Sequence, residues 1–196
     1  MQNLYVLKET SFNSDIIDSL KLASDSVNSR KDKDLYITTR LLEKYILNGR
    51  EKHIDDNGKP YANEGSKYNL SQVGEYACAY ESEDGEVGVD IAIIKDYDKH
   101  FIERIFSEEE RKSLITGEDI TKAWTIKEAL IKCVGIGLKG LNDVKIDSDC
   151  ICSYKTEQYN YKCFKYKNYI IACVSKNEIS IQAPKELKLD DLFINK

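Results

Sequence analysis

The chain has 196 residues, with 29 Lys and Arg against 34 Asp and Glu and a formal net charge of −5. A chain of this length can form one sizeable domain or two small ones, each with a buried core. Because both signs of charge are mixed, the composition argues against the one-sign surface that attracts nucleic acid or membranes. An anionic ligand would therefore have to be held by a few local residues.

Neither a signal peptide nor a membrane span is apparent. Lys8 and Glu9 stand where a signal peptide needs an apolar core, and nowhere do about 18 apolar residues run together. The six cysteines form no Cys-x-x-Cys pair, and we expect them to be reduced and buried as small hydrophobes. These features predict a cytoplasmic protein.

The first half of the chain predicts helices followed by strands. Residues 14–23 and 34–47 have helical spacing of apolar side chains. Residues 55–66 gather Asn-Gly, Pro and Gly, which predicts a loop. Residues 67–71 and 75–82 then read as two strands around a turn at Gly74.

The second half begins at the turn formed by residues 82–86, which is our candidate boundary between two lobes. Residues 86–94 alternate as a strand, and residues 98–106 predict a helix. Strand-like runs follow later at residues 163–175 and 178–183. The order of elements predicts an α+β fold in two consecutive lobes with mainly antiparallel sheets.

A helix starting near Thr121 has two different faces. Its small and apolar residues fall on one side, which predicts a core face. Trp124, Glu128 and Lys132 follow one another at intervals of four and form a stripe on the other side. An exposed Glu-Lys pair is the plainer interpretation, but a bulky Trp124 beside the pair makes a solvated face less favourable.

Three glycines follow this helix and spell Gly-x-Gly-x-x-Gly at Gly135, Gly137 and Gly140. A dinucleotide-binding loop of this form links a strand to a helix N-terminus, whereas these glycines come after a helix. We therefore predict a helix C-cap and a tight turn.

Asp90 lies in the middle of the apolar strand sequence VGVDIAII. A buried carboxylate is costly unless it is paired, hydrogen-bonded or bound to a cation, so Asp90 is a candidate functional residue. The alternative is a structural Asp whose hydrogen bonds are satisfied. Gly88 beside it would leave room for a ligand to approach the backbone. Glu110, three residues after Ser107, is explained by a capping box.

Several short motifs together resemble those of the 4′-phosphopantetheinyl transferases of the surfactin-synthetase-activating type. They are GVDIA, FSEEE and WTIKEALIK, preceded by NGKPY and YNLSQ, in this order along residues 57–132. Each motif is weak by itself, and five in sequence are a specific signal. The resemblance covers residues 57–141, while the ends match only in length and in the order of the lobes.

The resemblance implies a fold and an activity. The expected fold is a pseudo-dimer of two similar α+β lobes, each a small antiparallel sheet with packed helices. Residues 1–84 would form the lobe on the coenzyme A nucleotide side, and residues 85–196 the lobe with the metal site and the carrier-protein contact. The enzyme would transfer the phosphopantetheine arm of coenzyme A to a serine of an acyl or peptidyl carrier protein and release adenosine 3′,5′-bisphosphate.

The resemblance also implies roles for individual residues. Asp90 and Glu128 would hold Mg²⁺, with Glu128 also accepting the proton of the attacking serine. Lys132 would reach the phosphates of coenzyme A. The remaining contacts to coenzyme A would come from Lys59, Ser71 and Gln72. These residue types suit a diphosphate under attack, which needs hard oxygen ligands for a metal and a cation near the leaving group.

Two positions depart from the family pattern. Ala92 stands where many relatives have a Glu two residues after the Asp, and a water could take that position on Mg²⁺. Gln72 replaces a His and can donate a hydrogen bond but carries no charge. The alternative function is therefore a catalytically weakened paralogue that binds coenzyme A or a carrier protein without efficient transfer.

The expected partners are coenzyme A and a carrier protein, with no nucleic acid and no membrane. Fatty-acid, polyketide and nonribosomal-peptide carriers all remain open. We expect the protein to act as a monomer.

Overall fold

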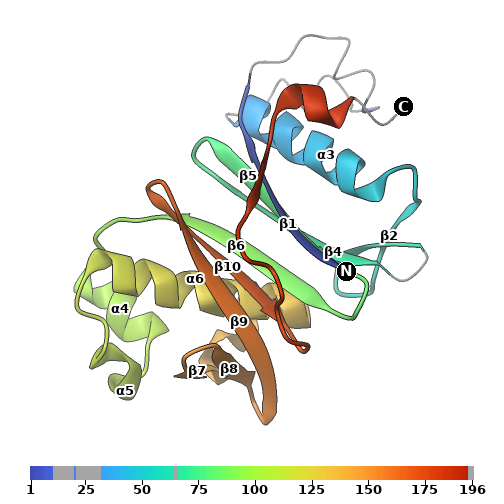
Figure 1. The fold of residues 1–196 in the computed structure, drawn as a ribbon. Helices are drawn as coiled ribbons and strands as arrows, with labels where there is room; N and C mark the ends of the chain where they lie inside the picture. Colours follow the sequence, from blue (N-terminus) through green and yellow to red (C-terminus); the bar gives the residue numbers. More distant parts are fainter. Residues whose placement is uncertain (11–19, 21–31, 64–65, 194–196) are drawn as a thin grey trace.

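The protein folds into two sheets with a long helix on the outer side of each (Figure 1). The structure is a computed structural model that describes residues 1–10, 20, 32–63 and 66–193. Within these residues, the first sheet has the strand order β11-β1-β5-β4-β3-β2, and the second has the order β6-β10-β9-β8-β7.

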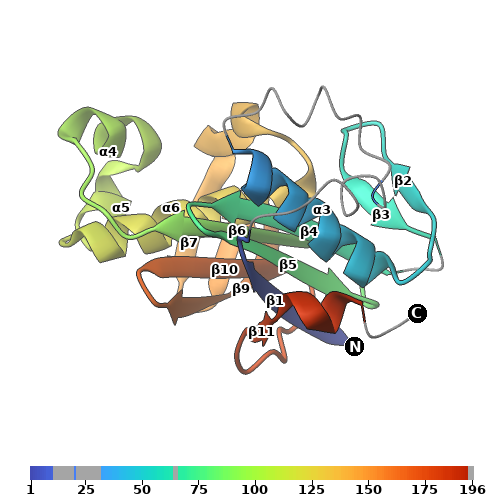
Figure 2. The ribbon, with the colours of Figure 1, turned by 90° about the horizontal axis from the view of Figure 1, so that it is seen from above.

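In its described residues, the first lobe comprises the first sheet, one α-helix and one short 3₁₀ helix. Its elements are β1 (Gln2–Lys8), α3 (Lys33–Leu47), β2 (Lys52–Ile54), β3 (Pro60–Ala62), β4 (Lys67–Val73), β5 (Tyr76–Ser82), β11 (Lys185–Leu187) and η2 (Leu189–Leu192). Viewed from above, α3 lies across the sheet, and β11 runs beside β1 (Figure 2).

The second lobe comprises the second sheet and the helices that follow its first strand. Its elements are β6 (Val87–Ile93), α4 (Lys99–Ile105), α5 (Glu108–Arg111), α6 (Gly117–Val134), η1 (Leu138–Asp143), β7 (Val144–Ser148), β8 (Ile151–Tyr154), β9 (Glu157–Tyr166) and β10 (Tyr169–Ser175).

The two lobes repeat one topology. In each, a first strand leads through helical structure to four consecutive antiparallel strands, and the last of these returns to pair with the first. The pairs that close the two lobes are β1 with β5 and β6 with β10, both antiparallel. The predicted α+β fold of two similar lobes is confirmed.

Alternation along the strands places the two sheets between the two long helices. Leu4 and Val6 of β1 pack with Val89 and Ile91 of β6 in one cluster, so the sheets share a core. Tyr5 and the other intervening residues of β1 pack against α3 instead. A further cluster joins α6 to the opposite face of the second sheet. The layers are therefore α3, first sheet, second sheet and α6.

Two expectations for the first half need comment. Residues 55–66 do not form only a loop, because β3 pairs with β2 in a short hairpin whose turn contains the Asn-Gly sequence. The Asn-Gly, Pro and Gly residues correctly indicate a turn, but the strands beside it are too short to be recognised from the sequence pattern. The helix predicted at residues 14–23 lies outside the described residues, apart from Leu20. The helix predicted at residues 34–47 is confirmed by α3.

The segment that follows β10 corrects another expectation. Residues 178–183 were expected to form a strand, but they pair with no strand in the described structure. Ile179 and Ile181 alternate because they bury their side chains in the core between the sheets while the chain crosses to the first lobe. There β11 pairs in parallel with β1. The division of the lobes at residue 84 stays a prediction. β11 comes after this division in the sequence but pairs within the first sheet.

Both ends of α6 carry capping residues. The helix begins earlier than expected from Thr121, because Thr116 and Asp119 form a capping box before it. At the other end, Gly135 takes the left-handed conformation with φ 77°, and its N–H donates to the carbonyl of Ile131. The predicted glycine C-cap is confirmed.

Gly88 has a different reason from the one that the sequence suggested. A Cβ at this position would lie 2.0 Å from the carbonyl oxygen of Ala129 and 2.5 Å from the backbone nitrogen of Cys133. The expectation that Gly88 leaves room for a ligand is wrong, because the backbone of α6 occupies that space. The glycine lets β6 and α6 approach closely.

We predict that Gly88→Ala lowers the free energy of unfolding by about 3 kcal/mol, because the three atoms nearest to the new methyl group are all backbone atoms. Chemical denaturation measures the loss. Gly58→Ala is the control, since it meets no atom within 4 Å and adds only a left-handed backbone strain of about 1 kcal/mol. Equal losses in both variants would contradict the close approach of β6 and α6.

Two further expectations concern membranes and cysteines. Among the described helices, none combines the length and the apolar character needed to cross a bilayer. All six cysteines are free, as expected. Four of them are buried, whereas Cys150 is exposed and Cys163 is partly exposed.

Candidate active site

Asp90 lies near the middle of β6, on the strand face that α6 covers. The residue is only 6% exposed. The Oδ1 atom accepts hydrogen bonds from the Ser71 hydroxyl at 2.8 Å and from the Lys132 ammonium at 2.7 Å. The buried carboxylate thus has the paired environment that its burial requires. Its partners come from both lobes, β4 and α6.

Ser71 links the lobes through three hydrogen bonds. Its hydroxyl donates to Asp90 and accepts from Lys132 at 2.9 Å and from the backbone N–H of Ile91 at 3.4 Å. Two residues earlier on β4, the Asn69 side chain accepts from the N–H of Val89 at 3.1 Å. β6 is an edge strand of its sheet, so these side chains satisfy amide groups that have no neighbouring strand.

Gln72 follows Ser71 and contacts α3 and the residue before it. Its side-chain oxygen accepts from the Thr39 hydroxyl, and its amide nitrogen donates to Asp32, the residue that precedes α3, at 3.3 Å. The side chain also lines the same pocket as Asp90. Gln72 therefore connects α3 to the pocket as a neutral hydrogen-bonding group.

Glu128 lies on α6, one turn before Lys132, and faces the same pocket. Its Oε1 atom is buried and finds no hydrogen-bond partner among the described residues. Burial raises the pKa of the Glu128 carboxyl above its ordinary value, and the negative charge of Asp90 adds to this, while Lys132 opposes it. An unpartnered buried oxygen beside a second carboxylate is the kind of group that a cation satisfies.

These side chains meet in one pocket between the lobes, with a volume of about 450 Å³. Its lining residues are Ser71, Gln72, Val73, Asp90, Ile91, Ala92, Ile93, Lys95, Tyr97, Phe101, Trp124, Glu128 and Lys132. The pocket has an ionic part around Asp90 and an apolar part around Trp124. The stripe predicted on the helix from Thr121 faces this pocket.

The apolar wall of the pocket is a row of aromatic rings. Tyr97 stacks on Phe101 with ring centres 4.8 Å apart, and Phe101 meets the edge of Trp124 at 5.3 Å. Tyr97 and Phe101 had no predicted role. Their spacing of four residues at the start of a predicted helix was a signal that they share one side.

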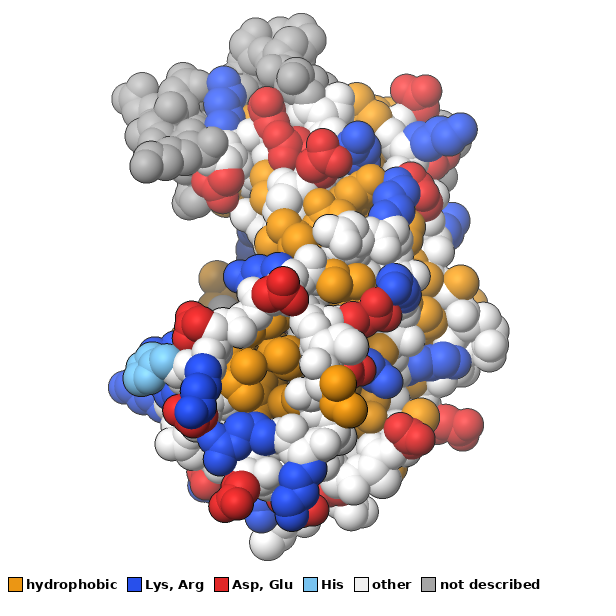
Figure 3. Space-filling view, turned by 90° about the vertical axis from the view of Figure 1, so that its left-hand side faces the viewer, with side chains coloured by type: hydrophobic (Ala, Val, Ile, Leu, Met, Phe, Trp, Pro, Cys, Tyr) orange, Lys and Arg blue, Asp and Glu red, His pale blue; other side chains and the backbone are white. Residues whose placement is uncertain are grey.

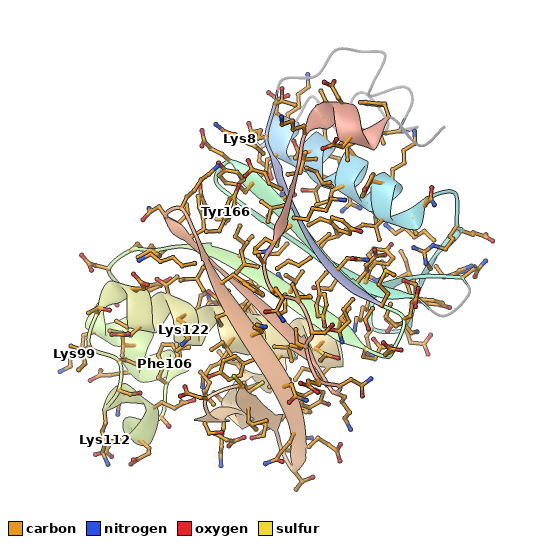
Figure 4. All side chains as sticks on the ribbon, viewed as in Figure 1. Lys8, Lys99, Phe106, Lys112, Lys122 and Tyr166 are labelled. Carbon is orange, nitrogen blue, oxygen red and sulfur yellow. The ribbon has the colours of Figure 1, made fainter. Side chains whose placement is uncertain are left out.

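The region near α4 has a mixed surface. Seen from the side on which α4 lies, hydrophobic side chains reach the surface in the middle of the molecule, with charged side chains around them (Figure 3). Tyr166 of β9 lies where the two lobes meet, and its ring contacts Tyr76 of β5 edge-on at 5.3 Å (Figure 4). The contact between the lobes is thus both apolar and polar.

Lys127 and Glu110 support the site from outside it. The Lys127 side chain is 2% exposed, and its Nζ lies 2.9 Å from Glu110 and donates to the carbonyls of Ile105 and Val144. Glu110 also completes the capping box of α5 that the sequence predicted. Lys127 therefore fixes α6 to the segments before and after it and does not line the pocket.

Lys59 is the one predicted site residue that the structure places apart from the others. Its side chain is 8% exposed and pairs with Glu86, and it does not line the pocket of Asp90 and Glu128. The structure thus brings together Ser71, Gln72, Asp90, Glu128 and Lys132, and it leaves Lys59 outside this group. A role of Lys59 in binding coenzyme A stays a prediction from the resemblance.

The pocket can be compared with the needs of a divalent cation. The described residues contain no cluster of three or more His, Cys, Asp or Glu side chains suited to a metal. Two carboxylates do face one pocket, and the buried Glu128 Oε1 is free to accept a cation. Mg²⁺ takes oxygen ligands and commonly keeps several waters. Asp90 and Glu128 therefore fit a cation held by two carboxylates and water.

Part of the chain is similar in sequence to a known protein family. Residues 86–174 match the sequence model of the 4′-phosphopantetheinyl transferase superfamily (ACPS). The match spans the second lobe from the residue before β6 into β10, and it includes Asp90, Glu128 and Lys132. Ser71, Gln72 and Lys59 lie in the first lobe, outside the matched segment.

A curated relative carries the same activity in its name. It is the "Putative 4'-phosphopantetheinyl transferase slr0495" of Synechocystis sp., which is 35% identical over 91 residues. The aligned part is 42% of this chain and 37% of the relative. The chain therefore spans little more than a third of the length of that relative.

Proposed function

We propose that the protein transfers the 4′-phosphopantetheine arm of coenzyme A to a serine of an acyl or peptidyl carrier protein. The observation that carries this proposal is the meeting of Asp90, Glu128, Lys132 and Ser71 in one pocket between the lobes. The match of residues 86–174 to the transferase superfamily supports the same chemistry. The surfactin-synthetase-activating subtype is part of the proposal, on the motifs named above.

In the proposed reaction, the serine oxygen forms a bond to the phosphorus that carries the pantetheine arm. The bond from this phosphorus to the oxygen that bridges the two phosphates breaks, and adenosine 3′,5′-bisphosphate leaves with the electron pair. Glu128 accepts the serine proton, directly or through a water.

Asp90 and Glu128 would hold the Mg²⁺, which would supply positive charge to the phosphate oxygens. Lys132 is a second source of positive charge. Its ammonium donates to Asp90 and Ser71, and we propose that it turns to the diphosphate when coenzyme A binds. Ser71 and Gln72 would donate hydrogen bonds to phosphate from β4. The aromatic wall of Tyr97, Phe101 and Trp124 would exclude water from the apolar side.

The two lobes would divide the work. Residues 1–84 would contact the nucleotide part of coenzyme A, and residues 85–196 would hold the metal and meet the carrier protein. The direct test is incubation with coenzyme A, Mg²⁺ and a panel of apo carrier proteins, followed by intact mass measurement. We expect one phosphopantetheine adduct per carrier domain. Tight binding of coenzyme A by calorimetry with no adduct on any carrier would support the weakened paralogue instead.

We predict that Lys132→Gln lowers kcat/KM for coenzyme A by about 100-fold, because one charge-assisted contact to phosphate is lost. Steady-state kinetics with a carrier protein measures the change. Lys122→Gln is the matched control on the same helix, because Lys122 lines a different groove, beside β7 (Figure 4). Equal activity of both variants would contradict the proposed role of Lys132 in binding the phosphates.

A further inference from the structure

Lys59 belongs to the first lobe but directs its side chain into the second. Its ammonium donates to Glu86 Oε2 at 2.5 Å and to the backbone carbonyl of Cys133 at 2.8 Å. Glu86 directly precedes β6, and Cys133 is the next-to-last residue of α6. The single cation therefore contacts both ends of the chain segment that contains the pocket's acidic residues.

The carbonyl of Cys133 has a specific need for a donor. The last carbonyl groups of a helix have no amide of the next turn to bind, and the helix dipole makes this end negative. After α6, the N–H groups of Gly135 and Ile136 both turn back to Ile131. Lys59 is thus the donor that completes the end of α6 from the other lobe.

The turn that presents Lys59 is built to hold one position. The Asp55 carboxylate accepts hydrogen bonds from the backbone N–H groups of Asn57 at 2.9 Å and of Lys59 at 2.8 Å. Asn57 lies against the C-cap of α6, since a Cβ at Gly135 would be 3.7 Å from its side chain. These backbone hydrogen bonds and the contact of Asn57 with α6 therefore hold the backbone at Lys59 beside the end of α6.

The end of α6 also decides where Lys132 lies. Lys132 precedes Cys133 and reaches across the lobes to Ser71 and Asp90. A shift of the last turn of α6 relative to β4 would lengthen the Lys132–Ser71 hydrogen bond. A small misplacement of this kind costs much in a reaction that depends on the position of charged groups.

We infer that Lys59 is a positioning residue that fastens the first lobe to the C-terminal end of α6 and so keeps Lys132 beside Ser71 and Asp90. Its partner is Glu86, which a second lysine, Lys67, also contacts at 3.3 Å. The effect on transfer rests on the proposed function, whereas the effect on stability does not. This role differs from direct binding of coenzyme A phosphate.

The test is a double-mutant cycle with Lys59→Met and Glu86→Gln. We expect Lys59→Met to lower the midpoint of thermal unfolding by about 5 °C. Glu86→Gln should also lower the midpoint of thermal unfolding. The double variant should have a midpoint no lower than that of the less stable single variant, because both changes break the same contact. In transfer assays, kcat of Lys59→Met falls about tenfold, while KM for coenzyme A changes less than about twofold.

Lys67→Met is the matched control, because Lys67 contacts the other oxygen of Glu86 and the ring of Tyr61 and is one-third exposed. We expect it to shift the unfolding midpoint by less than about 1 °C. If Lys59→Met does not fold, Lys59→Arg and Glu86→Gln complete the comparison. A tenfold rise in KM for coenzyme A with an unchanged midpoint would overturn the proposal, as would additive effects of Lys59 and Glu86. The unfolding data decide the contact even if no carrier protein is modified.

Discussion

Glu128→Gln is expected to abolish transfer and to make the metal-free protein more stable. The substitution keeps the shape of the side chain and removes a negative charge that would serve as metal ligand and proton acceptor, so we expect transfer to fall about 1,000-fold or more. The same charge is buried, unpartnered at Oε1 and close to Asp90. Its removal should raise the midpoint of thermal unfolding in EDTA by about 2–4 °C.

The control for this variant is Glu118→Gln, which lies on the same helix but forms an exposed ion pair with Lys165. Neither transfer nor stability should change much in this control. Intact mass of the carrier and thermal unfolding in EDTA give the two measurements. A Glu128→Gln variant that keeps a tenth of the wild-type rate would contradict the proposed role of Glu128.

Asp90→Asn is expected to abolish transfer and to make the protein less stable. Transfer should again fall about 1,000-fold, because a charged oxygen ligand is lost. Stability falls, however, because the Asp90 carboxylate pairs with Lys132 at 2.7 Å, and this lysine would lose its counter-charge in a mostly buried place. The expected loss is about 1–2 kcal/mol, reduced from that of a fully buried pair because Lys132 is partly exposed.

A second substitution separates the causes of these effects. In the Asp90→Asn background, Lys132→Met should restore part of the lost stability while transfer stays absent, since the unpaired cation is removed. Asp149→Asn, at an exposed position, is the control and should leave both quantities unchanged. The two carboxylates thus differ in the sign of their effect on stability. An equal loss of stability in Glu128→Gln and Asp90→Asn would mean that Glu128 has a partner in the metal-free protein.

Local patterns were sufficient to predict much of the fold. The alternation of β6, the capping box at Ser107 and the C-cap at Gly135 depend on neighbours within a few residues, and all three are present. Short-range signals failed where pairing depends on distant segments. Residues 178–183 alternate like a strand, but no strand of the described structure lies beside them to pair with.

The candidate site could be predicted in its residues and only partly in its geometry. The stripe of Trp124, Glu128 and Lys132 follows from helical spacing. Asp90 was a candidate because a carboxylate buried in an apolar strand is costly unless it has a partner. The contact of Lys132 with Ser71 joins residues 61 positions apart. The burial of Lys59 against Cys133 joins residues 74 positions apart. No local pattern carries such information.

The return of β11 to the first sheet has a consequence for how the chain is made. β1 pairs with β5 on one side, and among the described strands its other side pairs with β11. When the ribosome has released β1 to β5, it has therefore not yet supplied residues 185–187. The second sheet can form completely before β11 has been synthesised, because all its strands precede β11 in the sequence. The outer edge of β1 stays unpaired by β11 until that strand has been made.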